Sequence, residues 1–306
     1  MKIMVFDVGG TEIKYSVMNE QMHRTNSGAV PTPQDTQAQF LDAVYRLYAP
    51  HKDEVSGIAM ALPGFVDNRT GYVSNGGALL YNTATPVGQL LAEKCGCPVI
   101  LENDGKAAAM AELANGALKD CCNAAVFIIG TGVGGGIIAN GQLVRGVHFT
   151  AGEYSFVNTN AEAWDAPDQN MACQCSTKNL LKWYRARKAL PEDAPLDGRS
   201  FFAAANAGEP EALEVLRRFC HAVAVQIFNL TVLLDVEKVA IGGGISKQPL
   251  LLESLRSAYN GLYASRAGQA YMEGLPRCQI VPCAFSSEAN QVGVAAAYFE
   301  AMQKKR

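Results

Sequence analysis

Two stretches of the chain decide the fold: KIMVFDVGGTEIKYSVM at residues 2–18 and AAVFIIGTGVGGGIIA at residues 124–139. In each, an apolar, β-branched segment is interrupted by glycines and then resumes, which predicts a β-hairpin with a glycine turn. The predicted strands are residues 2–8 and 13–18 in the first stretch, and 125–129 and 137–138 in the second. The recurrence of this plan about 120 residues later predicts one structural device used once in each half of the chain.

Strands and helices alternate along the rest of the chain, which places the protein in the α/β class. The helix at residues 36–48, for example, puts Phe40, Val44 and Leu47 on one face. Further strands are predicted at residues 24–30, 55–62, 98–101, 239–241 and 279–283. Further helices are predicted at residues 85–95, 105–118, 176–189, 199–206, 211–234, 249–263 and 291–303.

Composition excludes several classes of protein. The 306 residues are 49% hydrophobic, and 26 basic against 29 acidic residues give a formal net charge of -3. A nucleic-acid-binding protein would normally show a basic excess, so we expect no nucleic-acid partner. The start of the chain does not resemble a signal peptide, and the longest apolar runs, such as Ala124 to Ile129, are too short to span a bilayer. Nine scattered cysteines fit a reducing cytoplasm, which is the expected location.

The two glycine turns are candidate phosphate sites. Successive backbone N–H groups in such a turn face one concavity, and side chains there would block the approach of an anion. Asp7, at the end of the first strand, is suited to order Mg²⁺ through water, because Mg²⁺ keeps several of its waters. Thr11 and Thr131 place hydroxyls at matching points of the two turns, and Lys14 adds a cation. The alternative is a pair of tight hairpins that hold no ligand.

A second group of polar residues stands where the strand at residues 98–101 meets the following helix. Asn103 can donate and accept hydrogen bonds, which suits a polyhydroxylated ligand. Asp104 can accept a proton from an alcohol during phosphoryl transfer. Taken alone, however, an aspartate at this place is more often only the N-cap of the helix. Farther along, Glu153 could accept hydrogen bonds from the same ligand or be a solvated loop residue. A third glycine loop, residues 242–244, could approach a nucleotide closely.

Taken together and in this order, these motifs resemble the ROK family of sugar kinases and related repressors. The residues that carry the resemblance are Asp7-Val8-Gly9-Gly10-Thr11, Leu62-Pro63-Gly64-Phe65-Val66-Asp67, Glu102-Asn103-Asp104 with Ala111-Glu112, Gly130-Thr131-Gly132-Val133-Gly134-Gly135-Gly136, Ala151-Gly152-Glu153 and Gly242-Gly243-Gly244. The resemblance implies an actin-like duplicated ATPase fold of the ribonuclease H-like type, with a cleft between two domains. We expect a small N-terminal domain at residues 1–117 plus the closing helix 290–306, and a larger domain at 118–289.

The resemblance also implies an activity, which is ATP- and Mg²⁺-dependent phosphorylation of a sugar hydroxyl, commonly O6 of a hexose, by a homodimer. By matching position, Asp104 is the expected catalytic base. The expected sugar-binding residues are Gly64, Gly77, Asn103, Asp104, Gly132, Glu153 and Phe156. The expected ATP-binding residues are Asp7, Gly9, Gly10, Thr11, Lys14, Thr131, Gly132, Gly243 and Gly244, with Asp7 holding Mg²⁺ through water.

The sequence departs from the family pattern at the zinc site. The family's motif places a histidine, which binds both zinc and sugar, where this chain has Phe156, and the family's run of cysteines is missing. Only Cys173 and Cys175 lie nearby, whereas a structural zinc takes about four ligands, so we expect no structural zinc. The chain thus resembles a zinc-less subgroup that includes β-glucoside kinases. The expected substrate is a glucose-type hexose or the non-reducing glucose of a β-glucoside such as cellobiose.

Other functions stay open at this point. Within the kinases, the alternatives are glucokinase, N-acetylmannosamine kinase and fructokinase, whose members usually keep the histidine and the zinc cysteines. From another class, the alternative is a ROK-type transcriptional regulator that responds to sugar. That function needs an N-terminal DNA-binding domain, whereas the first strand here begins at Lys2. A sugar-binding protein without catalysis is a third alternative, although Asp104 and both phosphate turns are intact.

Overall fold

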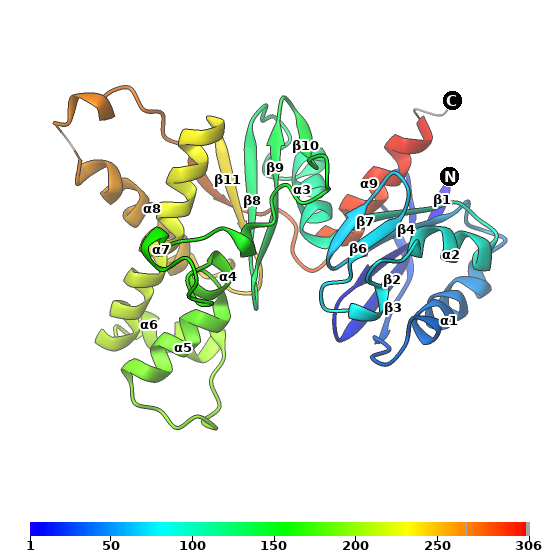
Figure 1. Ribbon diagram of the computed structural model, residues 1–306, viewed down its shortest axis with the longest axis horizontal. Helices are drawn as coiled ribbons and strands as arrows, with labels where there is room; N and C mark the ends of the chain where they lie inside the picture. Colours follow the sequence, from blue (N-terminus) through cyan, green and yellow to red (C-terminus); the bar gives the residue numbers. More distant parts are fainter. Residues whose placement is uncertain (267, 304–306) are drawn as a thin grey trace. The chain divides into compact units, whose positions relative to one another are not determined.

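The computed structural model describes residues 1–266 and 268–303, which form two compact units, each with its own sheet and core (Figure 1). Unit 1 comprises Met1–Asn115, Arg145–Ala151 and the C-terminal segment from Ser287, and unit 2 comprises Gly116–Val144 and Gly152–Ser286. The units are close to the domain ranges expected from the sequence, but residues 145–151, which were expected in the larger domain, belong to unit 1. The assignment of these units as functional domains stays a prediction.

Unit 1 is built on a five-stranded sheet with the order β3-β2-β1-β4-β7. Its strands are β1 (Lys2–Val8), β2 (Glu12–Asn19), β3 (Arg24–Pro31), β4 (Ile58–Leu62) and β7 (Val99–Asn103). The first three strands pair antiparallel, while β4 pairs parallel to both β1 and β7. The carboxyl ends of β1, β4 and β7 therefore meet at one edge of the sheet, which is where α/β proteins bind ligands.

Helices cover both faces of this sheet. Helices α1 (Gln37–Tyr48) and α2 (Val87–Cys95) pack on the face that carries Met4, Phe6 and Val8. Helices α3 (Asp104–Asn115) and α9 (Ala289–Gln303) pack against each other, and α9 contacts β1, β4 and β7. The remaining elements are the short hairpin β5 (Phe65–Asp67) and β6 (Tyr72–Asn75), and the 3₁₀ turns η1 (Ala49–His51) and η2 (Leu80–Asn82).

Unit 2 repeats the plan with the sheet order β10-β9-β8-β11-β12. Its strands are β8 (Ala124–Ile129), β9 (Val133–Ala139), β10 (Gln142–Val144), β11 (Lys238–Gly242) and β12 (Gln279–Pro282). As in unit 1, a hairpin opens the sheet, and two later strands join it in parallel. The repeated strand–glycine–strand pattern in the sequence thus correctly predicts one hairpin of this kind in each half of the chain, and the two sheets that contain the hairpins share a topology.

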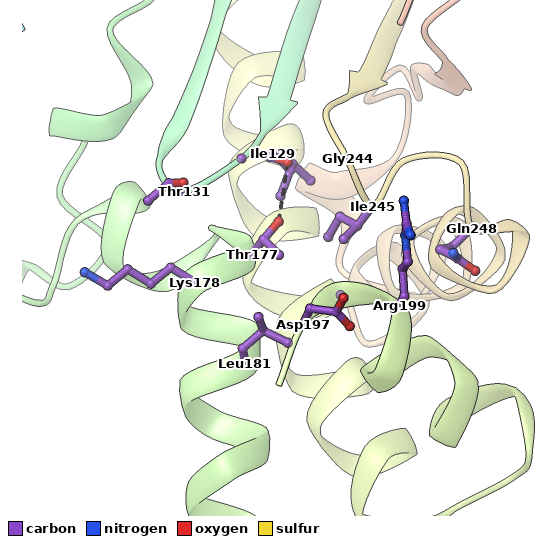
Figure 2. A pocket seen from close by; sticks show the side chains of 12 residues that line it. Ile129, Thr131, Thr177, Lys178, Leu181, Asp197, Arg199, Gly244, Ile245 and Gln248 are labelled. Atoms are coloured by element: carbon purple, nitrogen blue, oxygen red, sulfur yellow. Dashed lines mark hydrogen bonds between the residues drawn. The ribbon is translucent and has the colours of Figure 1, made fainter. Parts of the chain in front are cut away.

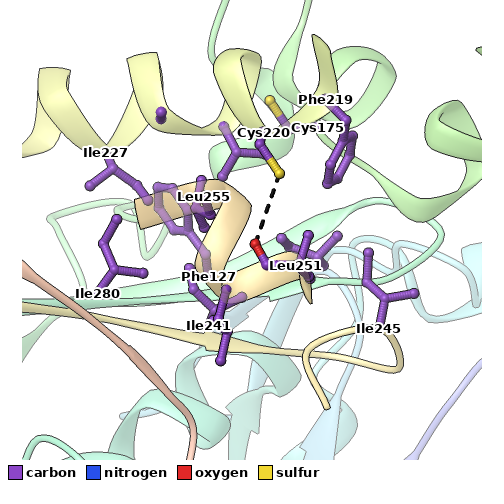
Figure 3. Packing of buried hydrophobic residues seen from close by; sticks show 14 of the residues in the cluster. Phe127, Cys175, Phe219, Cys220, Ile227, Ile241, Ile245, Leu251, Leu255 and Ile280 are labelled. Carbon is purple, nitrogen blue, oxygen red and sulfur yellow. Dashed lines mark hydrogen bonds between the residues drawn. The ribbon is translucent and has the colours of Figure 1, made fainter. Parts of the chain in front are cut away.

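The helices of unit 2 lie between and after these strands. They are α4 (Met171–Gln174), α5 (Thr177–Arg187), α6 (Gly198–Asn206), α7 (Pro210–Leu234) and α8 (Pro249–Ala264), with 3₁₀ turns η3 (Tyr154–Phe156), η4 (Ala161–Ala163) and η5 (Ala270–Met272). Figure 3 shows α7 and α8 packed over the sheet, with Phe127 and Ile241 of the strands meeting Leu251 and Leu255 of α8. Within the described residues, no helix is long and apolar enough to cross a membrane.

The contact between α3 and α9 in unit 1 depends on one glycine. A Cβ atom at Gly293 of α9 would overlap the carbonyl oxygen of Ala107 in α3. We expect Gly293→Ala to lower the free energy of unfolding by about 1–3 kcal/mol, because two packed backbones must separate to admit the methyl group. Gly261, in the interior of α8, is the matched control because its Cβ would meet nothing within 4 Å. Gly261→Ala is expected to raise the free energy of unfolding by about 0.5–1 kcal/mol. Urea unfolding of both variants measures the difference, and equal effects would contradict the account.

Candidate functional site

A pocket of about 600 Å³ lies in unit 2 at the carboxyl ends of β8 and β11 (Figure 2). This volume lies within the usual range for small-molecule sites. The pocket is lined by four short segments: Ile129, Gly130 and Thr131 after β8; Thr177, Lys178 and Leu181 of α5; Asp197, Gly198 and Arg199 at the start of α6; and Gly244, Ile245 and Gln248 before α8. Three of the four segments are helix N-termini, and the fourth is the predicted glycine turn.

Helix N-termini carry the positive end of the helix dipole, so a ring of them favours an anion such as phosphate. The chain fixes each of these starts locally. Ser176 caps α5, Asp197 and Ser200 form a capping box on α6, and Pro249 opens α8. In addition, the Thr177 backbone N–H donates to the carbonyl of Gly130 at 2.9 Å, which joins α5 to the glycine turn.

Gly243 allows the ends of β8 and β11 to come this close, and Gly135 allows a close approach within the hairpin of β8 and β9. Gly243 follows β11 with a φ of 97°, and a Cβ there would overlap the carbonyl oxygen of Ile129 at the end of β8. Gly135 in β9 has a φ of 145°, and a Cβ there would overlap the carbonyl oxygen of Val126. Other residues would be strained at both positions. The turn after β8 and the loop after β11 therefore meet at the pocket, and their part in holding a nucleotide stays a prediction.

The expected ATP-binding residues divide between the two units. Thr131 and Gly244 line the pocket, and Gly132 and Gly243 are their chain neighbours. The others, Asp7, Gly9, Gly10, Thr11 and Lys14, lie in unit 1 around the turn between β1 and β2.

The turn between β1 and β2 is fixed by hydrogen bonds from two side chains. The Thr32 hydroxyl donates to the carbonyl of Gly9 at 2.8 Å, and the Gln34 amide donates to the carbonyl of Gly10 at 2.7 Å. The Gly9 N–H also closes the hairpin by donating to the carbonyl of Glu12. These bonds occupy carbonyl oxygens of the turn, so its backbone has a fixed shape before any ligand binds.

Asp7 is a buried carboxylate beside that turn. Burial raises its pKa, while a hydrogen bond from the Asn290 amide to Oδ1 at 2.8 Å and the charge of Lys14 oppose the rise. Lys14 is its partner in the antiparallel pairing of β1 with β2. A buried carboxylate next to a fixed backbone turn fits the part expected for Mg²⁺, which is bound through one or two carboxylates and keeps several waters.

Asn103 and Asp104 stand where β7 passes directly into α3. The Asn103 side chain accepts a hydrogen bond from the Lys106 N–H at 3.0 Å and donates to the carbonyl of Gly64 at 2.9 Å. The capping bond to α3 thus comes from Asn103 and not from Asp104, for which the N-cap was one of the two roles considered from the sequence. Asp104 is the first residue of the helix, and its Oδ1 accepts from the Gly105 N–H at 2.7 Å.

The glycines expected at the sugar site in unit 1 lie beside Asn103. Gly64 and Gly77 have φ values of 95° and 56°, and a Cβ on Gly77 would lie 2.9 Å from the Gly64 nitrogen. Because Asn103 bonds to the Gly64 carbonyl, these three residues and the adjacent Asp104 form one cluster at the carboxyl edge of the sheet. The structure therefore brings together four of the residues that the sequence assigned to the sugar.

The other expected sugar residues lie together in unit 2. A Cβ on Gly132 would lie 3.4 Å from the hydroxyl of Ser155, and that hydroxyl donates to the carbonyl of Val133 at 2.8 Å. Ser155 belongs to η3, which Glu153 precedes and Phe156 ends. The Phe156 side chain is 70% exposed, which is unusual for an aromatic residue of this size.

The loop after Phe156 is held by hydrogen bonds between polar residues. Both the backbone N–H and the hydroxyl of Thr159 donate to the carbonyl of Gln169, and Asn158 forms a β-bridge with Asn170. Cys175 is buried, which raises the pKa of its thiol to about 12, whereas zinc binds the thiolate. Among the described residues, no three His, Cys, Asp or Glu side chains gather as a metal site. The expected absence of a structural zinc stays a prediction.

Sequence reasoning missed several residues of the pocket, namely Thr177, Lys178, Asp197, Arg199 and Gln248. They come from three segments that are far apart in the chain, and of these only the segment of Gln248 lies next to a glycine motif, residues 242–244. The one available signal is Asp197 with Ser200 three residues later, the spacing of a capping box, which marks a helix start.

A ROK family model matches residues 3–303 of the chain. The chain belongs to the ROK family. A β-glucoside kinase from Listeria innocua is 30% identical over 84% of this chain and 87% of the relative, and an N-acetyl-D-glucosamine kinase from Vibrio atlanticus is 31% identical over 82% and 86%. The crystal structure of a ROK family protein from Streptococcus pneumoniae in complex with sucrose superposes with a TM-score of 0.87 at 28% identity, over 99% of this chain and all of that one. The predicted α/β fold of the actin-like ATPase type is confirmed.

Proposed function

We propose that this ROK protein is an ATP-dependent sugar kinase that transfers the γ-phosphoryl group of ATP to a sugar hydroxyl. The observation that carries the proposal is the pocket at the ends of β8 and β11, where three helix N-termini and a glycine turn converge. Such a ring suits the phosphates of a nucleotide. The similarity to kinases for β-glucosides, N-acetylglucosamine and glucose over about four fifths of the chain supports the same conclusion.

Phosphoryl transfer needs positioning and charge stabilisation more than covalent help from the protein. Asp104 accepts the proton of the attacking hydroxyl, while Gly105 holds one of its carboxylate oxygens at the start of α3. Asn103, Gly64 and Gly77 form the wall beside it, and Glu153 accepts from sugar hydroxyls. Backbone N–H groups at Thr131 and Gly244 face the nucleotide. Mg²⁺, which Asp7 would hold through water, neutralises charge on the phosphate oxygens when it is bound.

For the substrate, we propose a glucose-type hexose phosphorylated at O6, with a β-glucoside such as cellobiose preferred to free glucose. Phe156 supports this choice because an exposed aromatic ring offers an apolar surface to an aglycone and no hydrogen bond to an anomeric hydroxyl. The relatives named β-glucoside kinase support it as well. We further propose a homodimer, as the resemblance to the family implies. We also propose a location in the reducing cytoplasm, for which the nine scattered cysteines are the supporting observation.

The experiment that tests the kinase function is an ADP-release assay with ATP, Mg²⁺ and a panel of acceptors. The panel contains glucose, fructose, N-acetylglucosamine, N-acetylmannosamine and cellobiose. ADP release that depends on one of these sugars supports the proposal, and the ranking of kcat/KM identifies the substrate class. A ranking with N-acetylglucosamine first would favour the function of the relatives named N-acetyl-D-glucosamine kinase, one of which is 31% identical over 82% of the chain.

Asp7→Asn is expected to stabilise the folded protein and to lower its activity at low Mg²⁺. Burial raises the pKa of Asp7 in the folded state, so its ionised form costs stability at neutral pH. That cost vanishes as the pH falls below the ordinary carboxyl pKa, and asparagine removes it at every pH. We expect the variant to have a higher unfolding temperature than the wild type at pH 7 but not at pH 3.

The Asp7→Asn variant should also lose about tenfold in kcat at low Mg²⁺. Calorimetry and a Mg²⁺ titration of kcat measure both effects, and a less stable or fully active variant would contradict the role of Asp7.

A further inference from the structure

We infer that Arg145 is a positioning residue for the proposed kinase reaction: through the buried carboxylate of Glu102 it holds the strand end that bears Asn103 and Asp104. The inference rests on the proposed function and adds a residue that no sequence motif singled out. Arg145 follows β10 and belongs to the short segment, residues 145–151, that packs in unit 1.

Both oxygens of the Glu102 carboxylate take part in this link. Oε2 accepts from the Arg145 Nε–H at 2.8 Å, and Oε1 accepts from the Asn103 backbone N–H at 3.0 Å. The Glu102 side chain is fully buried, whereas Arg145 is partly exposed. A partly exposed guanidinium is thus joined through one carboxylate to the backbone of the residue that precedes the expected catalytic base.

Arg145 also contacts the element on the other side of that base. Its Nη2 lies 3.4 Å from the sulfur of Met110, two turns into α3. Glu102 belongs to β7 and Met110 to α3, and these two elements meet directly between Asn103 and Asp104. One side chain therefore spans the junction at which Asp104 is placed, so a change in Arg145 moves the strand and the helix relative to each other.

Stability alone does not explain a buried charge at this position. Desolvation of a carboxylate is costly, and a buried ion pair is often no more stable than apolar residues of the same volume. Burial raises the pKa of Glu102, and Arg145 and Lys106 act against that rise. The arginine thus favours an ionised carboxylate that can accept from Asn103. A buried ion pair that also accepts from the backbone of an adjacent functional residue fixes the position of that residue, which is what a positioning role requires.

The segment that carries Arg145 is itself fixed in place. The Ala151 N–H donates to the carbonyl of Arg145 at 3.2 Å, which closes residues 145–151 into a loop. Within it, the ring of Phe149 lies 4.7 Å beneath the guanidinium of Arg69. After Ala151 the chain continues into Gly152 and Glu153, the residue expected to bind sugar hydroxyls. Arg145 therefore begins the segment that leads to one predicted sugar residue and secures the strand end that carries two others.

The test is a double-mutant cycle of Arg145→Met and Glu102→Gln, with kcat and KM measured for the best sugar acceptor. We expect Arg145→Met to lower kcat by about 10- to 100-fold, with KM for ATP unchanged, because the reacting groups lose alignment while the pocket of unit 2 is intact. The double variant should lose no more than Arg145→Met alone, since Glu102 mediates the effect. Arg145→Lys, which keeps the charge, should regain at least half of the lost kcat on a logarithmic scale.

The control is Arg187→Met. Arg187 forms an ion pair with Glu214 through the same atoms at the same 2.8 Å, but on the surface. The Arg187→Met variant should have the kcat of the wild type.

An inactive wild-type protein would refute the kinase function, whereas an active wild type with an equally active Arg145→Met would refute only the positioning role. If the kcat losses of the two single variants multiply in the double variant, the positioning role is refuted as well. If Arg145→Met does not fold, the double variant, which buries no unpaired charge, is compared with Glu102→Gln. Equal kcat values for these two variants support mediation by Glu102. A lower kcat for the double variant overturns it.

Discussion

Asp104→Asn is expected to lower kcat by about 10²–10⁴-fold, the usual cost of losing a general base. Asparagine has the shape of aspartate and keeps an oxygen that can accept from the Gly105 N–H, as Asp104 does now at 2.7 Å. It cannot take a proton from the sugar hydroxyl. Because the capping bond of α3 comes from Asn103, the helix should not depend on this carboxylate. Steady-state kinetics and thermal unfolding of the same preparation measure the two effects separately.

Asp235→Asn is the matched control for that change. Asp235 ends α7 with a φ of 49°, a conformation that asparagine adopts readily, and it lies on the surface. The variant should have the kcat of the wild type. Near-normal turnover by a folded Asp104→Asn protein would remove Asp104 as the base. A loss of kcat that is explained by a lower unfolding temperature would instead give it a structural role.

Phe156 is expected to set the preference for β-glucosides. A phenyl ring cannot hydrogen-bond to the anomeric hydroxyl of free glucose, and a polar group that is buried without a partner when the sugar binds costs about 1–3 kcal/mol. A β-linked aglycone has no such hydroxyl and can lie against the exposed ring. We therefore expect kcat/KM for cellobiose to exceed that for glucose by about 10- to 100-fold. Phe156→His should raise kcat/KM for glucose, because imidazole can hydrogen-bond the hydroxyl.

Phe156→Leu separates hydrogen bonding from loss of the ring. Leucine is apolar like phenylalanine, so it should not raise kcat/KM for glucose, although it should lower that for cellobiose. Initial rates with both sugars for the three proteins give the comparison. A wild type that prefers glucose or N-acetylmannosamine by about tenfold would refute the aglycone argument and leave the kinase function standing.

The sequence predicted the parts of the fold that depend on neighbouring residues. The strand–glycine–strand pattern at residues 2–18 and 124–139 gave both hairpins, because a turn and its flanking strands are coded locally. The parallel strands β4, β7 and β11 were recognisable as short apolar runs bounded by turn residues. The exact end of β7 was missed by two residues, so the direct passage from strand to helix at Asp104 was not expected.

The parts that the sequence did not predict depend on contacts between distant residues. Residues 145–151 read as a loop between a hairpin and Glu153, and nothing in them shows that Arg145 pairs with Glu102, 43 positions earlier. Asn290, which bonds to Asp7 across 283 positions, has no motif of its own either. In the pocket, the glycine turn was recognisable, but the helix starts at Thr177 and Asp197 converge on it only through tertiary packing.

The most direct measurement of the central claim is ³¹P NMR of the purified protein incubated with ATP, Mg²⁺ and cellobiose or glucose. We expect the γ-phosphate signal of ATP to fall as ADP and a sugar monophosphate resonance, split by the two protons on C6, rise in equal amounts. Asp104→Asn protein under the same conditions should leave ATP intact. The wild type must first be shown to be folded by a cooperative thermal unfolding transition. If it then forms no sugar phosphate with any sugar of the panel, the protein is not a sugar kinase.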